Sequence, residues 1–225
     1  MFIKKEIEQF TQFEKKYWLY FLELEEQFLT TKRYVSFDKA NFKTFSVEYL
    51  KLFEAVCSEI DVVGRVIAHK IDSNFNIQNA NIQKWWFTIQ DWYHEDKLEP
   101  IKIQEELQFS PWSGFNTEQF INKQGSICYR LTNKAKMPYW WISYNKVKHN
   151  RTLDDPKTQE QFFHRANLEN VCYAFSGLYL LEKRYLMSVG EAKEYNRCQK
   201  SKLFENNKPL LYIDEDGDLA QVDDE

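Results

Sequence analysis

Residues 171–181 read VCYAFSGLYLL, and they lie in a longer stretch, 159–187, that is apolar nearly all round when it is drawn as a helix. Such a helix is normally buried on every side. We therefore predict a central helix from about Gln159 to Met187, with the other elements packed around it.

Four further helices are expected, because apolar residues recur every three or four positions in other parts of the chain. The N-terminal stripe includes Ile7, Phe10 and Phe13 and continues to about Thr31. Ser46 is a typical N-cap residue, and Pro138 suits a first helical turn, where its missing amide proton is not needed. The predicted helices are 5–31, 46–70, 82–93 and 138–149.

The composition also favours helices. The chain has 225 residues but only six glycines and five prolines, about 5% together against a usual ~12%. A β-sandwich or barrel needs more tight turns, so we predict an all-α fold. The helical pattern breaks at 97–137, where we expect an irregular insertion with short β pieces near 99–103 and at 126–131.

The predicted domain organisation is a helical bundle at 1–190, followed by a C-terminal segment at 191–225. This segment contains a strand-and-turn signal at 210–217 and an acidic tail. From Leu210 onward it holds seven acidic residues and no basic ones. A solvated, charged end of this kind is common in interaction tails.

Several functional classes lack support in the sequence. No apolar run approaches the ~18 residues of a membrane span, and the N-terminus lacks a signal-peptide core, so we expect a cytoplasmic protein. Its four cysteines have neither metal-ligand nor disulfide spacing, and we predict no metal and no cofactor. Phosphate-binding glycine loops and serine-hydrolase motifs are also missing from the sequence.

Charge is distributed unevenly. The formal net charge is −4, yet residues 119–153 contain no Asp or Glu. Phosphates are bound by grouped cations, and unpaired bases can stack on aromatic rings. RNA, or single-stranded nucleic acid in general, is therefore a candidate ligand; the alternative is that acidic neighbours neutralise the cations and that the nearby tryptophans belong to the core. The seven cations of this segment are Lys123, Arg130, Lys134, Lys136, Lys146, Lys148 and Arg151.

The predicted helix 138–149 carries candidate chemical groups. Trp140, Tyr144 and Val147 share its apolar face, and Asn145 and His149 project together from its flank. A histidine with a pKa near neutrality is a plausible proton-transfer group. Alternatively, His149 caps the carbonyls at the end of its helix.

Asp61 falls among the core-facing residues of the predicted helix 46–70. A buried carboxylate needs a cation or a donor, and the first candidates are Lys146 and His149. Asn167 and Asn170 share the apolar face of the central helix and also need partners. These groups either fix the register of the helices or form a site assembled from three of them.

The run PYWWISYNKVKHNR at 138–151 resembles a tryptophan-rich YNxxKHxR signature of HEPN-like bacterial proteins. This superfamily consists of helical bundles in phage defence, abortive infection and toxin systems. The resemblance implies a HEPN-like helical bundle with a partly β insertion, a homodimer, RNA as the ligand, and a metal-independent endoribonuclease activity.

The resemblance also implies site residues. His149 matches the catalytic histidine of the superfamily, but no arginine occupies the positions available ahead of it, Ile142 to Tyr144. The phosphate-binding role then falls to Lys146, Lys148 or Arg151, and Asn145 and Asp61 would orient the site. The alternative function is a non-catalytic helical module that acts through a protein partner in phage defence.

Overall fold

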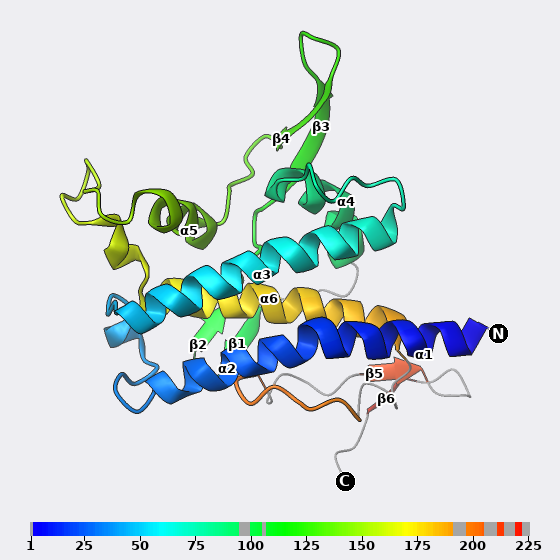
Figure 1. Cartoon of the computed structure of the whole chain (residues 1–225), viewed down its shortest axis with the longest axis horizontal. Coiled ribbons are helices and arrows are strands. Elements are labelled where there is room, and N and C mark those ends of the chain that lie inside the picture. The colour runs from blue at the N-terminus through cyan, green and yellow to red at the C-terminus, as the bar shows by residue number, and fades with distance from the viewer. Residues whose placement is uncertain are drawn as a thin grey trace.

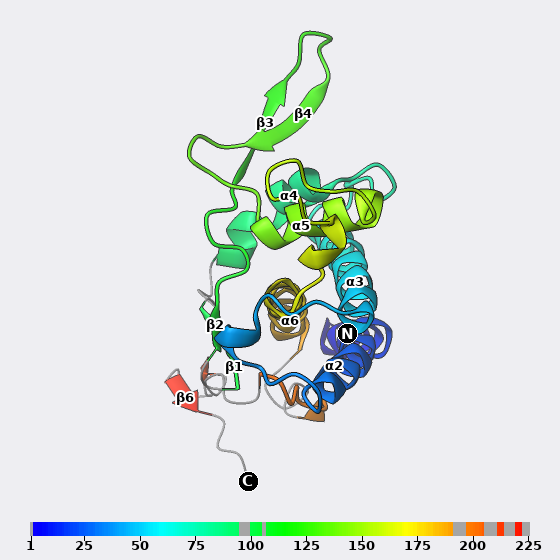
Figure 2. The same ribbon diagram turned by 90° about the vertical axis from the view of Figure 1, so that its left-hand side faces the viewer.

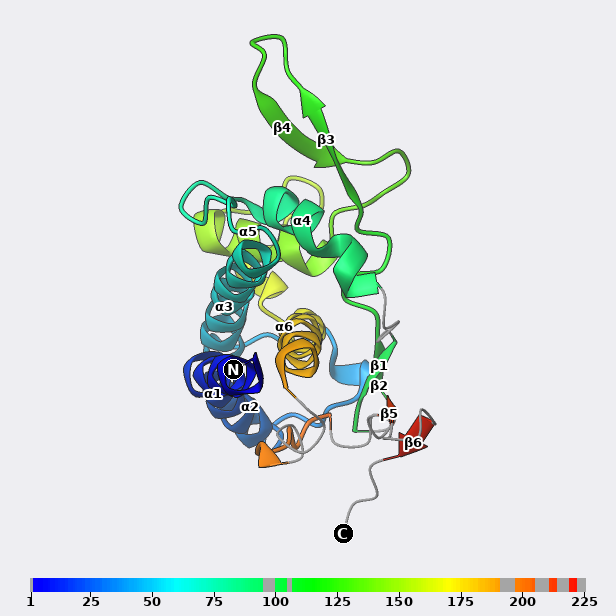
Figure 3. The same cartoon turned by 90° about the vertical axis from the view of Figure 1, so that its right-hand side faces the viewer.

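The computed structural model describes residues 2–94, 100–104, 107–190, 197–204, 211–213 and 219–221. Helix α6, Leu168–Val189, runs through the middle of the molecule (Figure 1). Figures 2 and 3 show the N-terminal helices and α3 (Val47–Ile71) along one side of α6. Helices α4 (Ile82–His94) and α5 (Tyr139–Asn150) lie above α6, and a small hairpin lies on the opposite side. The prediction of a central, buried helix is confirmed.

The predicted start of the central helix at Gln159 is wrong by nine residues. Phe162–Arg165 form a 3-10 turn instead, and Asn167, in an extended conformation, caps α6 by accepting a 3.1 Å hydrogen bond from the amide of Asn170. The Asn170 side chain donates to the carbonyl of Arg165 at 2.8 Å. These two amide side chains therefore set where α6 begins.

The predicted N-terminal helix is continuous but not uniform. Helix α1, Phe2–Phe13, passes through a π-helical turn, Glu14–Trp18, into α2, Leu19–Thr31. A π-turn shifts the faces of a helix relative to one another. Buried Trp18 lies at this turn, and its indole donates to the carbonyl of Gln199 at 2.8 Å.

Helix α3, Val47–Ile71, begins as predicted, because the Ser46 hydroxyl accepts a 3.0 Å hydrogen bond from the amide of Tyr49. Helix α4, Ile82–His94, crosses it closely. At Gly64 a Cβ would lie 2.7 Å from the Trp85 ring. This glycine therefore lets α4 approach the backbone of α3.

Helix α5, Tyr139–Asn150, also lies where the sequence predicts it, although Pro138 precedes the first turn and does not form part of it. The Pro138 carbonyl accepts from the amides of Trp141 and Ile142 at 3.0 and 3.1 Å. Trp140 is 2% exposed, and its indole donates to the carbonyl of Pro111. The tryptophans of this helix thus anchor it to the body of the protein.

The all-α prediction is wrong, because the described residues also form antiparallel two-stranded sheets. A low glycine and proline count argues against large sheets with many turns, but it does not exclude short hairpins. Four strands lie within the predicted insertion at 97–137, so a helical bundle with a partly β insertion is in part correct. The pairs are β1 (Ile101–Ile103) with β2 (Leu107–Phe109), β3 (Thr117–Ile121) with β4 (Ile127–Leu131), and β5 (Leu211–Ile213) with β6 (Leu219–Gln221).

The first two hairpins differ in their surroundings. In β1 and β2 the side chains of Ile101, Ile103, Leu107 and Phe109 are buried, and both strands contact α6. The hairpin β3–β4 projects from the body beside α4 (Figures 1 and 3). Across its end Ile121 pairs with Ile127, and these side chains are 70% and 58% exposed.

Two remaining expectations concern the acidic tail and membrane-spanning helices. All seven acidic residues of the predicted tail fall within 214–218 and 222–225, outside the described residues. Of the helices in the described parts of the chain, none combines the length and the apolar character needed to cross a membrane.

Candidate functional site

A groove of about 530 Å³ lies where α5 faces α3 and the start of α4. It brings together four of the six predicted site residues: Asp61, Asn145, Lys146 and Lys148. It also contains Arg65, which the sequence analysis did not select. The other lining residues are Ser58, Ala80, Asn81, Ile82, Gln83, Met137, Trp141, Ile142 and Tyr144.

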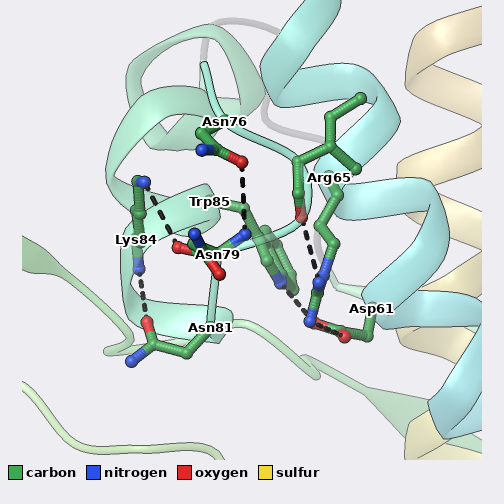
Figure 4. Close-up of polar contacts among 8 residues, drawn as sticks. Asp61, Arg65, Asn76, Asn79, Asn81, Lys84 and Trp85 are labelled. Atoms are coloured by element: carbon green, nitrogen blue, oxygen red, sulfur yellow. Dashed lines mark hydrogen bonds and ion pairs between the residues drawn. The ribbon is translucent and has the colours of Figure 1, made fainter.

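Asp61 does not bind the partners predicted for it. Its Oδ2 accepts from Nη2 of Arg65 at 2.5 Å, and its Oδ1 accepts from the indole of Trp85 at 3.0 Å (Figure 4). The expected partners Lys146 and His149 are not in contact with it, because a cation four residues along α3 already lies beside the carboxylate. The side chain of Asp61 is 29% exposed, so it faces the groove and is only partly buried.

Arg65 is held from two directions. Besides its ion pair with Asp61, its Nη1 donates to the carbonyl of Ile77 at 3.0 Å, which ties α3 to the loop before α4. Its Nε is buried and has no hydrogen-bond partner among the described residues. The spacing Asp61–Arg65 on a predicted helix was the signal in the sequence that could have identified it.

Helix α5 contributes two lysines that are not neutralised. Lys146 and Lys148 are exposed, and neither forms an ion pair with a carboxylate of the described residues. Their ammonium groups lie 5.2 Å from the ring centroid of Phe162 and 5.4 Å from that of Tyr144. With Arg65 they give the groove three positive charges against the single negative charge of Asp61, so the groove favours anions.

The other polar groups of the groove are neutral. Asn145 is exposed and donates to the carbonyl of Trp141 at 3.0 Å, within its own helix. Burial, with the nearby Cys57 thiol and the carboxylates of Asp61 and Glu54, raises the pKa of Tyr144 to about 12. The Tyr144 phenol is therefore protonated at neutral pH and can donate hydrogen bonds but does not act as a base.

The start of α4 also lines the groove, through Ile82 and Gln83. Asn81 caps this helix by accepting a 3.0 Å hydrogen bond from the amide of Lys84. The amides of Ile82 and Gln83 have no acceptor among the described residues. Unpaired amides at a helix N-terminus favour negative charge nearby, which adds to the effect of the three cations.

The remaining two predicted site residues lie elsewhere. His149 and Arg151 are exposed and do not line the groove. Within the described residues His149 forms no hydrogen bond, neither to a carboxylate nor to the carbonyls at the end of α5. The structure therefore brings neither residue to the groove, and it does not place His149 in the capping position that the alternative interpretation required.

Two observations bear on the basic segment 119–153. Trp140, Trp141 and Tyr144 are at most 7% exposed, so they belong to the core, although Trp141 and Tyr144 also line the groove. Of the seven cations in 119–153, however, Arg130 alone pairs with a described carboxylate, that of Glu118 at 2.8 Å. The neutralisation that the alternative interpretation expected is therefore found, among the described residues, at Arg130 alone.

No group of three or more His, Cys, Asp or Glu side chains in the described ranges is arranged to hold a metal ion. Comparison of the chain with protein-family models, with curated proteins and with solved structures finds no match.

Proposed function

We propose that this protein binds single-stranded RNA through the groove between α3, α4 and α5. The observation that carries the proposal is the convergence of Lys146, Lys148 and Arg65 on one groove, in which the two lysines have no carboxylate partner among the described residues. In nucleic acids the negative charges lie on the backbone phosphates, and clustered lysines and arginines bind these phosphates.

The surroundings of the groove support an extended anionic ligand. Lys134 and Lys136 follow β4 and precede α5, and Arg151 follows α5. None of the three pairs with a described carboxylate. Cations beyond the groove can contact further phosphates of the same strand, because the sum of such contacts determines the affinity of a nucleic-acid backbone.

The cellular role rests on the resemblance of residues 138–151 to HEPN-like proteins. From that resemblance we propose a phage-defence or toxin-type role and a homodimer. We also propose a cytoplasmic location. Cleavage of the RNA has weaker support, because His149 lies outside the groove lining and a general base must reach the proton that it removes. Binding is therefore the function that the geometry favours over a metal-independent endoribonuclease.

The test is binding of a labelled RNA of about 12 nucleotides, in EDTA, over a range of salt concentrations. We expect Lys146→Ala/Lys148→Ala to lower the affinity at low salt and to reduce the slope of log Kd against log salt by about 1.4, which is ~0.7 for each lost phosphate contact. Lys51→Ala is the matched control, since Lys51 pairs with Glu48 on α3 and does not line the groove.

The same samples are run on a gel to detect cleavage. Fragments from the wild type but not from His149→Ala would restore the endoribonuclease assignment. If the wild-type protein binds no RNA at low salt, or if the lysine pair behaves like Lys51→Ala, the groove is not an RNA-binding site. The alternative function, a non-catalytic helical module that acts through a protein partner, would then be favoured.

A further inference from the structure

A second groove, also of about 530 Å³, continues from the first. It lies between the loop 78–81, Lys84 on α4 and residues 127–129 of β4. Ala80 and Asn81 line both grooves. The two grooves therefore meet at the N-terminus of α4, and a ligand that leaves the first groove there can enter the second.

The chemistry of the second groove differs from that of the first. Lys84 is its one charged lining residue, and no lining residue is acidic. Three side-chain amides line it, those of Gln78, Asn79 and Asn81, with the aromatic ring of Tyr129 from the hairpin. The first groove offers fixed cations, whereas the second offers amides and a ring.

The loop holds these amides without using most of their hydrogen-bonding capacity. Oδ1 of Asn76 accepts from the backbone amides of Gln78 and Asn79 at 3.0 and 3.3 Å, and Lys84 Nζ donates to the backbone carbonyl of Asn79 at 3.3 Å. The loop conformation is thus fixed through its backbone. Figure 4 shows Asn79 between Lys84 and Arg65, with Asn81 beside the backbone of Lys84.

The side-chain amides of Gln78 and Asn79 and the Nδ2 of Asn81 have no partner among the described residues. All three side chains are exposed. An amide offers a donor and an acceptor side by side, which matches the edge of an unpaired base. In a duplex that edge is already occupied by the complementary strand.

Tyr129 is positioned to provide a stacking surface. Its ring is half-buried in the hairpin and packs against Phe87 of α4, with centroids 5.3 Å apart. This contact supports the ring beside the groove. Base stacking on such a ring tolerates any sequence, because every base has a π-face.

We propose that the second groove receives unpaired bases of the same strand whose phosphates bind in the first groove. This inference rests on the proposed RNA-binding function, and it specifies the ligand as a single strand that crosses Asn81 from α5 toward the hairpin. Tyr129 stacks on a base, the amides of Gln78 and Asn79 contact base edges, and Lys84 contacts a phosphate.

The experiment compares oligouridylates of about four and about 12 nucleotides and a 12-base-pair RNA duplex. Wild-type protein should bind the longer strand more tightly than the shorter strand and than the duplex. Tyr129→Ala should weaken binding of the longer strand about tenfold and leave the shorter strand unchanged. Tyr129→Phe, which keeps the ring, should bind like the wild type.

Circular dichroism of each variant checks that the hairpin and the bundle are folded. If Tyr129→Ala fails to fold, the double variant Gln78→Ala/Asn79→Ala replaces it, because these exposed side chains support no other described residue, and a loss of affinity for the longer strand alone is expected. The double variant Lys146→Ala/Lys148→Ala should bind both the shorter and the longer strand more weakly than the wild type does.

The two proposals fail in different ways. The second groove is refuted if the wild type binds the strands but neither Tyr129→Ala nor the amide double variant changes the affinity for the longer one. It is also refuted if the duplex binds as tightly as the longer strand. Absence of any RNA binding by the wild type refutes the proposed function itself, and the second groove with it.

Discussion

The indole Nε1 of Trp85, on α4, donates a 3.0 Å hydrogen bond to Oδ1 of Asp61, on α3. This bond orients the carboxylate so that its other oxygen accepts from Arg65 (Figure 4). Arg65 in turn binds the loop carbonyl of Ile77. A single indole from α4 therefore helps to hold a cation at the groove.

Asp61→Asn should lower the stability of the protein without lowering its affinity for RNA. The substitution weakens the Arg65 contact, and Arg65 already has one unsatisfied buried nitrogen, so we expect a loss of about 1–2 kcal/mol in the free energy of unfolding. It also removes the one negative charge of the groove. RNA affinity at low salt should consequently stay equal or rise. The amide that replaces the carboxylate keeps an oxygen that can accept from Arg65. Urea unfolding and RNA titration measure the two effects, and a fall in affinity would contradict the view that this negative charge opposes RNA binding.

Gly64→Ala should destabilise the protein, although alanine is ordinarily the better helix former by about 1 kcal/mol. The added Cβ would lie 2.7 Å from the Trp85 ring, and relieving that overlap costs about 1–3 kcal/mol. Gly177→Ala is the matched control, because its Cβ would lie 3.3 Å from two tryptophan rings and needs a smaller adjustment. Equal urea midpoints for the two variants would contradict this account of the α3–α4 contact.

Glu182→Gln should stabilise the protein increasingly as the pH rises. Glu182 is fully buried, both of its carboxylate oxygens lack partners among the described residues, and burial, with the charge of Glu59, raises its pKa well above the usual value. A raised pKa in the folded state means that the protonated side chain contributes stability below about pH 4.3, and that this contribution is lost at higher pH.

The measurement is the difference in free energy of unfolding between Glu182→Gln and the wild type from about pH 4 to pH 8. We expect a small difference at the acid end and a growing advantage of the variant above it. Glu8→Gln, an exposed change of the same kind, corrects for nonspecific effects. A difference that does not vary with pH would rule out burial of an ionisable carboxyl group at this position.

Lys183→Met should stabilise the protein at neutral pH, by up to about 3 kcal/mol. Burial lowers the pKa of Lys183 to about 8, so the unfolded chain binds more protons than the folded one between about pH 8 and pH 10.5. Over that window the stability contributed by the neutral amine increases with pH. The advantage of the variant should therefore be full below pH 8 and should decline above it.

Thermal or urea unfolding of both proteins across this window provides the check. Lys51→Met, at an exposed position on α3, is the control and should show no such pH dependence. If the stability advantage of Lys183→Met stays constant up to about pH 10.5, folding does not lower the pKa of Lys183, and the prediction is wrong.

The amino-acid sequence by itself determined the features that depend on near neighbours. The cap at Ser46 and the apolar surface of α6 follow from spacings of a few residues, and the structure agrees with both. These are interactions within one helix or one short segment, and the pattern of side chains is enough to establish them.

Only the tertiary structure decided which side chains meet. Asp61 pairs with Arg65 and Trp85, and His149 lies away from the groove, because the close approach of α4 to α3 at Gly64 and the docking of α5 by its tryptophans fix these positions. The β1–β2 hairpin, which makes the all-α prediction wrong, buries its apolar side chains against α6. Short strands are stabilised by such packing more than by intrinsic preference, so the sequence indicated a β piece near 99–103 but not its pairing with β2 or its burial against α6.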